Sequence, residues 1–292
     1  MTTEDAEAVL DLVTLCDIAE SGETTYTLDE IDTRLARTTL RGAVLDDPAG
    51  GLMAYAWLSQ NPALRIALGS VHLRPGGDWS IGPQLVDWLR DTAKEFGDGF
   101  ELHCFTAVAN SGMCRLFEGA GGEVVRRYYR MGIALDADRP ATRPPDGVVV
   151  RPVTGDADVR EMYDVIEPAF ADHYAHEPMT YEQWRERSVD GLCPDLGLWW
   201  LAEIGGRPAA GLYAMAAPQG GWIDTLGTLR EFRGRGLGRA LLHTAFAEFR
   251  RRGLPKAGLS VDATNPTGAL GLYESVGMTV EHEDVRYSLP VG

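Results

Sequence analysis

The chain has 292 residues, of which 45% are hydrophobic and 24% charged, as is usual for a globular protein with a sizeable core. Its 43 acidic residues outnumber its 27 basic residues, and the formal net charge of −16 disfavours general binding to nucleic acid or to an anionic membrane surface. The first residues, MTTEDAEAVL, lack the basic and apolar regions of a signal peptide. We therefore expect a cytoplasmic protein that binds neither nucleic acid nor membrane, with its oligomeric state left open.

The predicted elements fall into two halves. A helix begins near Asp5, and a strand-like run at 128–135 precedes the segment DADRPATRPPDG at 136–147, which contains three prolines and little that is apolar. Such segments are semi-rigid spacers between compact units. We expect one domain at 1–137, a linker at 138–147 and a second domain at 148–292.

The second half alternates strands and helices. Apolar residues recur at helical spacing in two segments, and short apolar runs bounded by turn signals indicate strands. The expected strands are 148–153, 198–204, 209–214, 222–229, 257–261 and 285–289, and the expected helices are 157–170, 237–251 and 268–275. This order predicts a mixed α/β unit built around one sheet.

The two halves resemble each other at an offset of 156 residues. Phe117 then falls on Tyr273, and Gly82 falls on Gly238. Matches at one offset over several elements indicate an internal repeat.

The most informative segment is RGRGLG at 233–238, between a predicted strand and a predicted helix. Backbone N–H groups at the start of a helix lack intrahelical partners, and glycines allow a phosphate to approach them. Arg233, Arg235 and Arg239 add positive charge. The segment matches neither the P-loop pattern nor the dinucleotide-binding pattern, so we interpret it as a different kind of pyrophosphate site.

The segment fits the pattern [RQ]-x-x-G-x-[GA], and Asn265 and Tyr273 follow it downstream. These features resemble the acetyl-CoA loop of the GNAT acetyltransferase superfamily, and the tandem arrangement is similar to the mycothiol synthase type. The resemblance implies tandem GNAT folds of the α/β (α+β) class, each a mixed, mostly antiparallel twisted sheet flanked by helices. It also implies that acetyl-CoA contacts Leu226, Gly227, Thr228, Arg233, Gly234, Arg235, Gly236, Leu237, Gly238, Arg239 and Asn265.

The same resemblance implies the chemistry, which is transfer of an acetyl group from acetyl-CoA to a small amine by direct attack. Tyr273 is expected to protonate the leaving thiolate. Asp224 is expected to act as the base or to orient the amine, and at strand period it would share a face with Thr228. Two alternatives stay open: a non-catalytic acyl-CoA-binding or sensory protein, and a protein N-terminal or lysine acetyltransferase.

Three further residues are candidates for the acceptor side. His173 and His176 lie in a segment that follows the first helix of the second half, and Trp222 lies on the strand that carries Asp224. The two histidines on a helix could hold a metal, but no third ligand is placed by the sequence, and the four cysteines form no CxxC pair. We expect no metal.

The first half lacks the features of the pyrophosphate site at 233–238, which we call the phosphate cradle. At the offset of 156 residues it reads GDWSIG at 77–82, where every arginine is missing and Asp78 adds an anion. A carboxylate beside a pyrophosphate costs free energy, and Phe117 lacks the hydroxyl of Tyr273. We expect residues 1–137 to form a degenerate GNAT-like domain.

Overall fold

The structure is a computed structural model that describes residues 3–22, 24, 26–36, 39–135, 143–171, 173–174, 176–190, 194–217, 219–264 and 268–292. By contact the chain forms two compact units, unit 1 (Met1–Tyr128 and His282–Gly292) and unit 2 (Tyr129–Glu281). The predicted domain boundaries follow the sequence repeat, whereas contacts group the last eleven residues with the first unit. The first part of the predicted linker, 138–142, lies outside the described residues.

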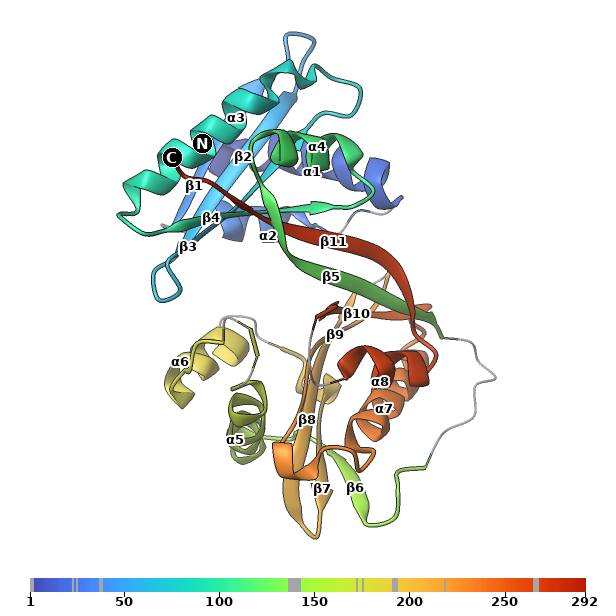
Figure 1. The fold of residues 1–292 in the computed structure, drawn as a ribbon. Helices are drawn as coiled ribbons and strands as arrows, with labels where there is room; N and C mark the ends of the chain where they lie inside the picture. Colours follow the sequence, from blue (N-terminus) through green and yellow to red (C-terminus); the bar gives the residue numbers. More distant parts are fainter. Residues whose placement is uncertain are drawn as a thin grey trace. The chain divides into compact units, whose positions relative to one another are not determined.

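Unit 1 contains a mixed sheet whose strands occur in the order β1, β2, β3, β4, β11. The pairs β1–β2, β2–β3 and β4–β11 are antiparallel, and β3–β4 is parallel. Its elements are α1 (Ala6–Ser21), α2 (Leu28–Leu35), β1 (Leu40–Asp46), β2 (Leu52–Asn61), β3 (Ile66–Leu73), α3 (Gly82–Glu95), β4 (Glu101–Ala107), α4 (Ser111–Gly119) and the end of β11 (Thr279–Leu289). Figure 1 shows these elements.

Period-two alternation along β2 divides the core of unit 1 between two faces. Ala54, Ala56 and Leu58 belong to the cluster formed with α3 and α4, while Tyr55 and Trp57 pack with α1 and α2. Each face of the sheet is therefore covered by its own pair of helices.

The strands of unit 2 occur in the order β5, β10, β9, β8, β7, β6. The pairs β6–β7, β7–β8 and β8–β9 are antiparallel, and β9–β10 is parallel. Its elements are β5 (Glu123–Ala134), β6 (Val148–Pro152), α5 (Asp156–Phe170), α6 (Tyr181–Arg185), β7 (Trp199–Ile204), β8 (Arg207–Ala217), β9 (Gly220–Thr228), α7 (Leu237–Arg251), β10 (Lys256–Asp262) and α8 (Ala269–Ser275).

These elements confirm the predicted fold class. The helix predicted at 237–251 has the bounds of α7, and the remaining predicted strands and helices of this half occur within a few residues of the expected places. Helices α5 and α6 cover one face of the sheet of unit 2, and α7 and α8 cover the other (Figure 1). The internal repeat is also evident, because the matched glycines lie at the starts of corresponding helices: Gly82 is the first residue of α3 and Gly238 the second residue of α7.

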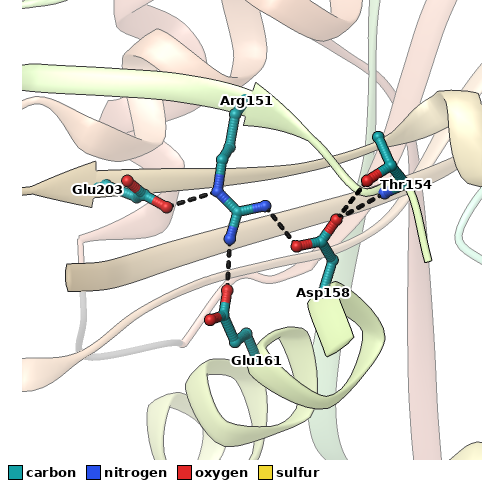
Figure 2. A network of polar contacts seen from close by, with 5 residues as sticks. All are labelled: Arg151, Thr154, Asp158, Glu161 and Glu203. Carbon is teal, nitrogen blue, oxygen red and sulfur yellow. Dashed lines mark hydrogen bonds and ion pairs between the residues drawn. The ribbon is translucent and has the colours of Figure 1, made fainter. Parts of the chain in front are cut away.

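A network of ion pairs joins the edge of this sheet to α5 (Figure 2). The guanidinium of Arg151 on β6 donates to Glu203 on β7, and to Asp158 and Glu161 on α5. Asp158 also accepts hydrogen bonds from the backbone N–H and the hydroxyl of Thr154, each at 2.8 Å. These hydrogen bonds, with a smaller effect of Arg151, lower the pKa of Asp158.

The helices and the cysteines of the described part of the chain bear on two expectations from the sequence. Among its helices, none is both long enough and apolar enough to cross a membrane. Three of the four cysteines lie in the described part, and Cys16, Cys104 and Cys114 are free thiols there. Burial raises the pKa of Cys16 to about 12, so this thiol stays protonated at neutral pH.

We predict that Arg151→Leu lowers the free energy of unfolding by about 2 kcal/mol at pH 7, because three partly buried carboxylates lose their shared partner. Since the folded-state pKa of Asp158 is depressed, its stabilisation is present above the ordinary carboxyl pKa of about 4 and is lost as pH falls through the folded-state value. Urea unfolding of the wild type and of Arg151→Leu between pH 7 and pH 3 measures the free energy of unfolding of each. The difference between the two free energies should become smaller as the pH falls.

Lys94→Met is the matched control, because Lys94 forms an exposed pair with Asp91. Its effect should stay within about 0.5 kcal/mol. A deficit in Arg151→Leu that is no larger than this control would contradict the structural role of the network.

Candidate functional site

Two glycines shape the start of α7. Gly234 and Gly236 have φ angles of 76° and 80°, in the left-handed region that glycine adopts without strain. Gly236 is the N-cap of α7, and no side chain caps the helix there. A Cβ on Gly234 would meet nothing within 4 Å, whereas one on Gly236 would lie 2.8 Å from Cγ of Pro145. The first N–H groups of α7 therefore have no side-chain cap, with open space beside Gly234 and the Pro145 ring close to Gly236.

The third glycine of the segment brings α8 close to this helix start. A Cβ on Gly238 would lie 2.9 Å from Leu272 on α8 and 3.9 Å from Leu226 on β9. Tyr273, the next residue on α8, is buried. The structure thus brings together the cradle, the end of β9 and the helix that carries Tyr273.

The three arginines of the cradle differ in their surroundings. Arg233 donates from Nε to the carbonyl oxygen of Thr228 at 3.2 Å and from Nη2 to that of Ala169 at 3.1 Å, so it ties the loop to β9 and α5. The guanidinium of Arg235 lies 5.5 Å from the ring centroid of Phe232. Arg235 and Arg239 are exposed. The positive charge open to a ligand therefore comes from Arg235 and Arg239, and Arg233 braces the loop.

A β-bulge interrupts the ladder between β8 and β9. Tyr213 is opposite Thr225, and the next residue of β8, Ala214, is opposite Ile223, so Asp224 is an extra residue on β9. Such a residue bends the strand and changes the direction of nearby side chains.

The bulge reverses the faces of β9. A Cβ on Gly221 would contact Phe249 of α7, whereas one on Gly227 would contact Ile166 and Ala169 of α5. Residues six apart on a regular strand share a face, so the extra residue has changed the phase. The prediction that Asp224 and Thr228 share a face is therefore wrong, because it assumed an uninterrupted strand.

Pairing on the other side of β9 also ends at this point. The parallel register with β10 runs from Gly221 to Ile223, although β9 continues to Thr228 and β10 to Asp262. Beyond Ile223 the two strands separate, so β10 does not pair with the backbone of residues 224–228. This is the stretch, Leu226 to Thr228, whose backbone the sequence predicts to contact acetyl-CoA.

Asp224 has unusual electrostatics. The residue is exposed, yet the protein around its carboxyl excludes part of the solvent, and this burial raises the pKa of Asp224. Two weaker effects lower it: a hydrogen bond of 3.0 Å donated by Thr225 Oγ1, and the positive charge of Arg187. The net shift makes Asp224 a stronger base than an ordinary aspartate.

An aromatic wall lies beside this carboxylate. Tyr213 stacks on Trp199 with ring centroids 4.7 Å apart and contacts Trp184 of α6. Burial raises the pKa of Tyr213, while hydrogen bonds to Thr225 and to Ser188 lower it less strongly. The sequence did not point to Tyr213, Thr225 and Arg187 as neighbours of the Asp224 carboxylate. Their arrangement around it depends on the bulge, and no residue pattern predicts the bulge.

The structure describes all three residues predicted for the acceptor side, and each has different neighbours. His173 and His176 follow the end of α5 and lie outside any helix. The exposed His173 ring lies 5.4 Å from that of Phe170, and His176 Nε2 lies 3.0 Å from Glu167 Oε1. Trp222 is exposed and packs its ring on Gly258 of β10.

Two other predictions concern the cofactor and metal. Asn265 falls outside the described residues. Within the residues that are described, no group of three or more His, Cys, Asp or Glu side chains could hold a metal ion.

Unit 1 lacks each feature of this site. The carboxylate of Asp78 accepts from the N–H and the hydroxyl of Ser80, both at 2.8 Å, so Asp78 caps the short 3-10 turn at 79–81 that leads into α3. Phe117 is fully buried in the core. The β2–β3 ladder runs from Ala54–Leu73 to Asn61–Ile66 without a register shift.

Comparisons with known proteins agree with this geometry. The sequence model described as Acetyltransferase (GNAT) family matches residues 159–278, all within unit 2. The mycothiol acetyltransferase of Thermobispora bispora is 33% identical over 250 residues, covering 83% of this chain and 80% of its own length. That of Thermomonospora curvata is 32% identical over 248 residues, covering 82% and 80%.

Solved structures show the same architecture over the whole chain. A GCN5-related N-acetyltransferase from Sphaerobacter thermophilus superposes with a TM-score of 0.84 at 27% identity, covering 100% of this chain and 94% of that one. A tandem GNAT protein from the clavulanic acid biosynthesis pathway has the same fold, with a TM-score of 0.79 at 15% identity and coverage of 100% and 97%. The chain therefore belongs to the GNAT acetyltransferase family, as an acyl-transferring enzyme of the tandem type.

Proposed function

We propose that unit 2 transfers an acetyl group from acetyl-CoA to a small amine. The observation that carries the proposal is the convergence of an uncapped helix start at Gly236, a basic carboxylate at Asp224 and a buried phenol at Tyr273 within one unit. The names of the relatives, mycothiol acetyltransferases, favour a small-molecule acceptor.

Each part of the site has a separate role in this reaction. The N–H groups at the start of α7, with Arg235 and Arg239, would hold the diphosphate of acetyl-CoA. The backbone of residues 226–228, which β10 leaves unpaired, would hold the thioester and polarise its carbonyl oxygen. Acetyl-CoA supplies the activated acyl group, and the protein supplies orientation and proton transfer.

Asp224 and Tyr273 would move the two protons. The attacking amine must be neutral, so Asp224 takes its proton directly or through water. Burial raises the pKa of Tyr273 to about 12, which keeps the phenol protonated at neutral pH. The same exclusion of solvent raises the pKa of a thiol beside it, so Tyr273 can still donate to the departing sulfur.

We predict that Gly234→Asp weakens acetyl-CoA binding about 10- to 100-fold at low salt, because it adds a carboxylate near the helix start that holds the diphosphate. Isothermal titration calorimetry measures the change, which should shrink as salt screens the repulsion.

Gly234→Asn is the matched control. Asn and Asp have nearly the same shape, both tolerate a positive φ, and a side chain here has open space. The Asn variant should retain affinity within a few-fold. Equal losses in both variants would show that the backbone, and not the charge, determines the effect.

The reaction itself is tested by release of the CoA thiol with a panel of polyamines, amino sugars and peptides. We expect turnover with a small amine, and we expect Tyr273→Phe to lower kcat about 100-fold with acetyl-CoA affinity unchanged, because the ring remains and only the hydroxyl is lost. Binding of acetyl-CoA without release for any acceptor would instead favour a non-catalytic binding protein.

For Asp224→Asn we predict a fall in kcat of about 100-fold or more, with loss of the acidic limb of the pH profile that Asp224 produces. The wild-type limb should lie above the ordinary carboxyl range, because the pKa of Asp224 is raised. Thr225→Val removes a hydrogen bond that lowers this pKa, so it should move the limb to higher pH. A profile unchanged in both variants would exclude Asp224 as the base.

A further inference from the structure

Unit 1 contains a cluster of unsatisfied donors on the face of its sheet that α1 and α2 cover. Tyr55 on β2 is fully buried, and its hydroxyl has no hydrogen-bond partner in the described part of the chain. The indole Nε1 of Trp57, on the same face of β2, is also buried and without a partner among the described residues. Buried polar groups are nearly always hydrogen-bonded, so two orphaned groups on one face require an explanation.

The side chain of Arg34, on α2, lies over the ring of Trp57. Its guanidinium is 4.9 Å from the ring centroid of Tyr26 and 5.2 Å from that of Trp57. Its Nη2 donates to the Tyr26 hydroxyl at the long distance of 3.5 Å. Its positive charge also acts on Tyr55 and on His72, whose rings stack 5.6 Å apart.

Arg34 is half-buried, and within the described residues no carboxylate forms an ion pair with it. The carboxylate four residues earlier, Glu30, is engaged by the N–H and hydroxyl of Thr27 at 2.8 and 2.9 Å. Arg151 is a contrast, because it is 28% exposed and contacts three carboxylates. A partly buried cation without an anion is unfavourable, so a counter-ion would stabilise Arg34.

The corresponding position in unit 2 differs in its charges. Thr27 and Thr180 each form a capping box at the second helix of their unit, and an arginine follows seven residues later, Arg34 and Arg187. Trp57 corresponds to Tyr213 at the offset of 156 residues. In unit 2 the positive charge of Arg187 acts on Asp224. In unit 1 the residue that matches Asp224 at the same offset is Leu68, on a strand without a bulge, so no carboxylate stands there.

We propose that Tyr26, Arg34, Tyr55, Trp57 and His72 form a binding site for the carboxylate of a small molecule. An indole N–H and a guanidinium only donate, and a phenol can donate, so the ligand atom that satisfies them is an acceptor. Burial lowers the pKa of His72 to about 4, so His72 is neutral at pH 7. The site then carries a single positive charge, which suits a monoanionic carboxylate, and its aromatic rings suit an apolar body.

The test uses the full chain, without acetyl-CoA, and benzoate as the probe. In ¹⁵N–¹H spectra the indole resonance of Trp57, assigned with Trp57→Phe, should shift saturably on addition of benzoate. Benzamide, which has the same shape but no charge, should shift it at least tenfold more weakly. Equal effects of the two probes, or no shift with benzoate, would overturn the proposal.

Two variants connect the binding to the named donors. Arg34→Met keeps the length of the side chain and should weaken benzoate binding at least tenfold, while acetyl-CoA binding in unit 2 is unchanged. Tyr55→Phe should weaken benzoate binding several-fold without lowering the melting temperature, because it removes a hydroxyl that is unsatisfied in the free protein. Undiminished binding in both variants would show that benzoate binds elsewhere. Because the assay needs no acetyl transfer, its result is independent of the proposed function of unit 2.

Discussion

The interrupted ladder between β8 and β9 is the feature on which the site depends. One extra residue at Asp224 turns its carboxylate toward Thr225 and Tyr213 and reverses the faces of the strand that follows. From the same point β9 loses its pairing with β10. The same point on β9 therefore supplies a basic carboxylate and a stretch of backbone that β10 leaves unpaired, and α7 begins close to that stretch because Gly238 packs against Leu226 and Leu272.

The two units show how one scaffold can hold opposite charges on the same face. In unit 2 the bulge adds Asp224 opposite Arg187, and in unit 1 an uninterrupted ladder leaves Arg34 without a carboxylate among the described residues. Helices α3 and α7 both begin without a side-chain cap, but in unit 1 Asp78 caps the short turn at 79–81 that leads into α3, whereas glycines precede α7. Small changes in register and in the residues before a helix thus distinguish the two units.

The sequence predicts much of this architecture and part of the site. Helical periodicity and glycine stop signals locate α7, and the Gly-rich segment locates the cradle, because these depend on local composition. The bulge at Asp224 depends on the pairing of β9 with β8, and no local sequence pattern indicates it. The predicted face of Asp224 was therefore wrong, and the sequence did not point to Tyr213. The bracing of α5 by Arg233 likewise depends on Ala169, 64 residues away in the chain. Fold class is local enough to infer, whereas side-chain direction in the site is set by long-range packing.

A crystal structure of the chain soaked with acetyl-CoA would show where the diphosphate and the thioester lie. We expect the diphosphate at the N–H groups of residues 234–238 and the thioester against the unpaired edge of β9 near Leu226, with the Tyr273 hydroxyl nearest the sulfur. Density for acetyl-CoA at residues 77–82 alone, or a thioester distant from β9, would contradict it.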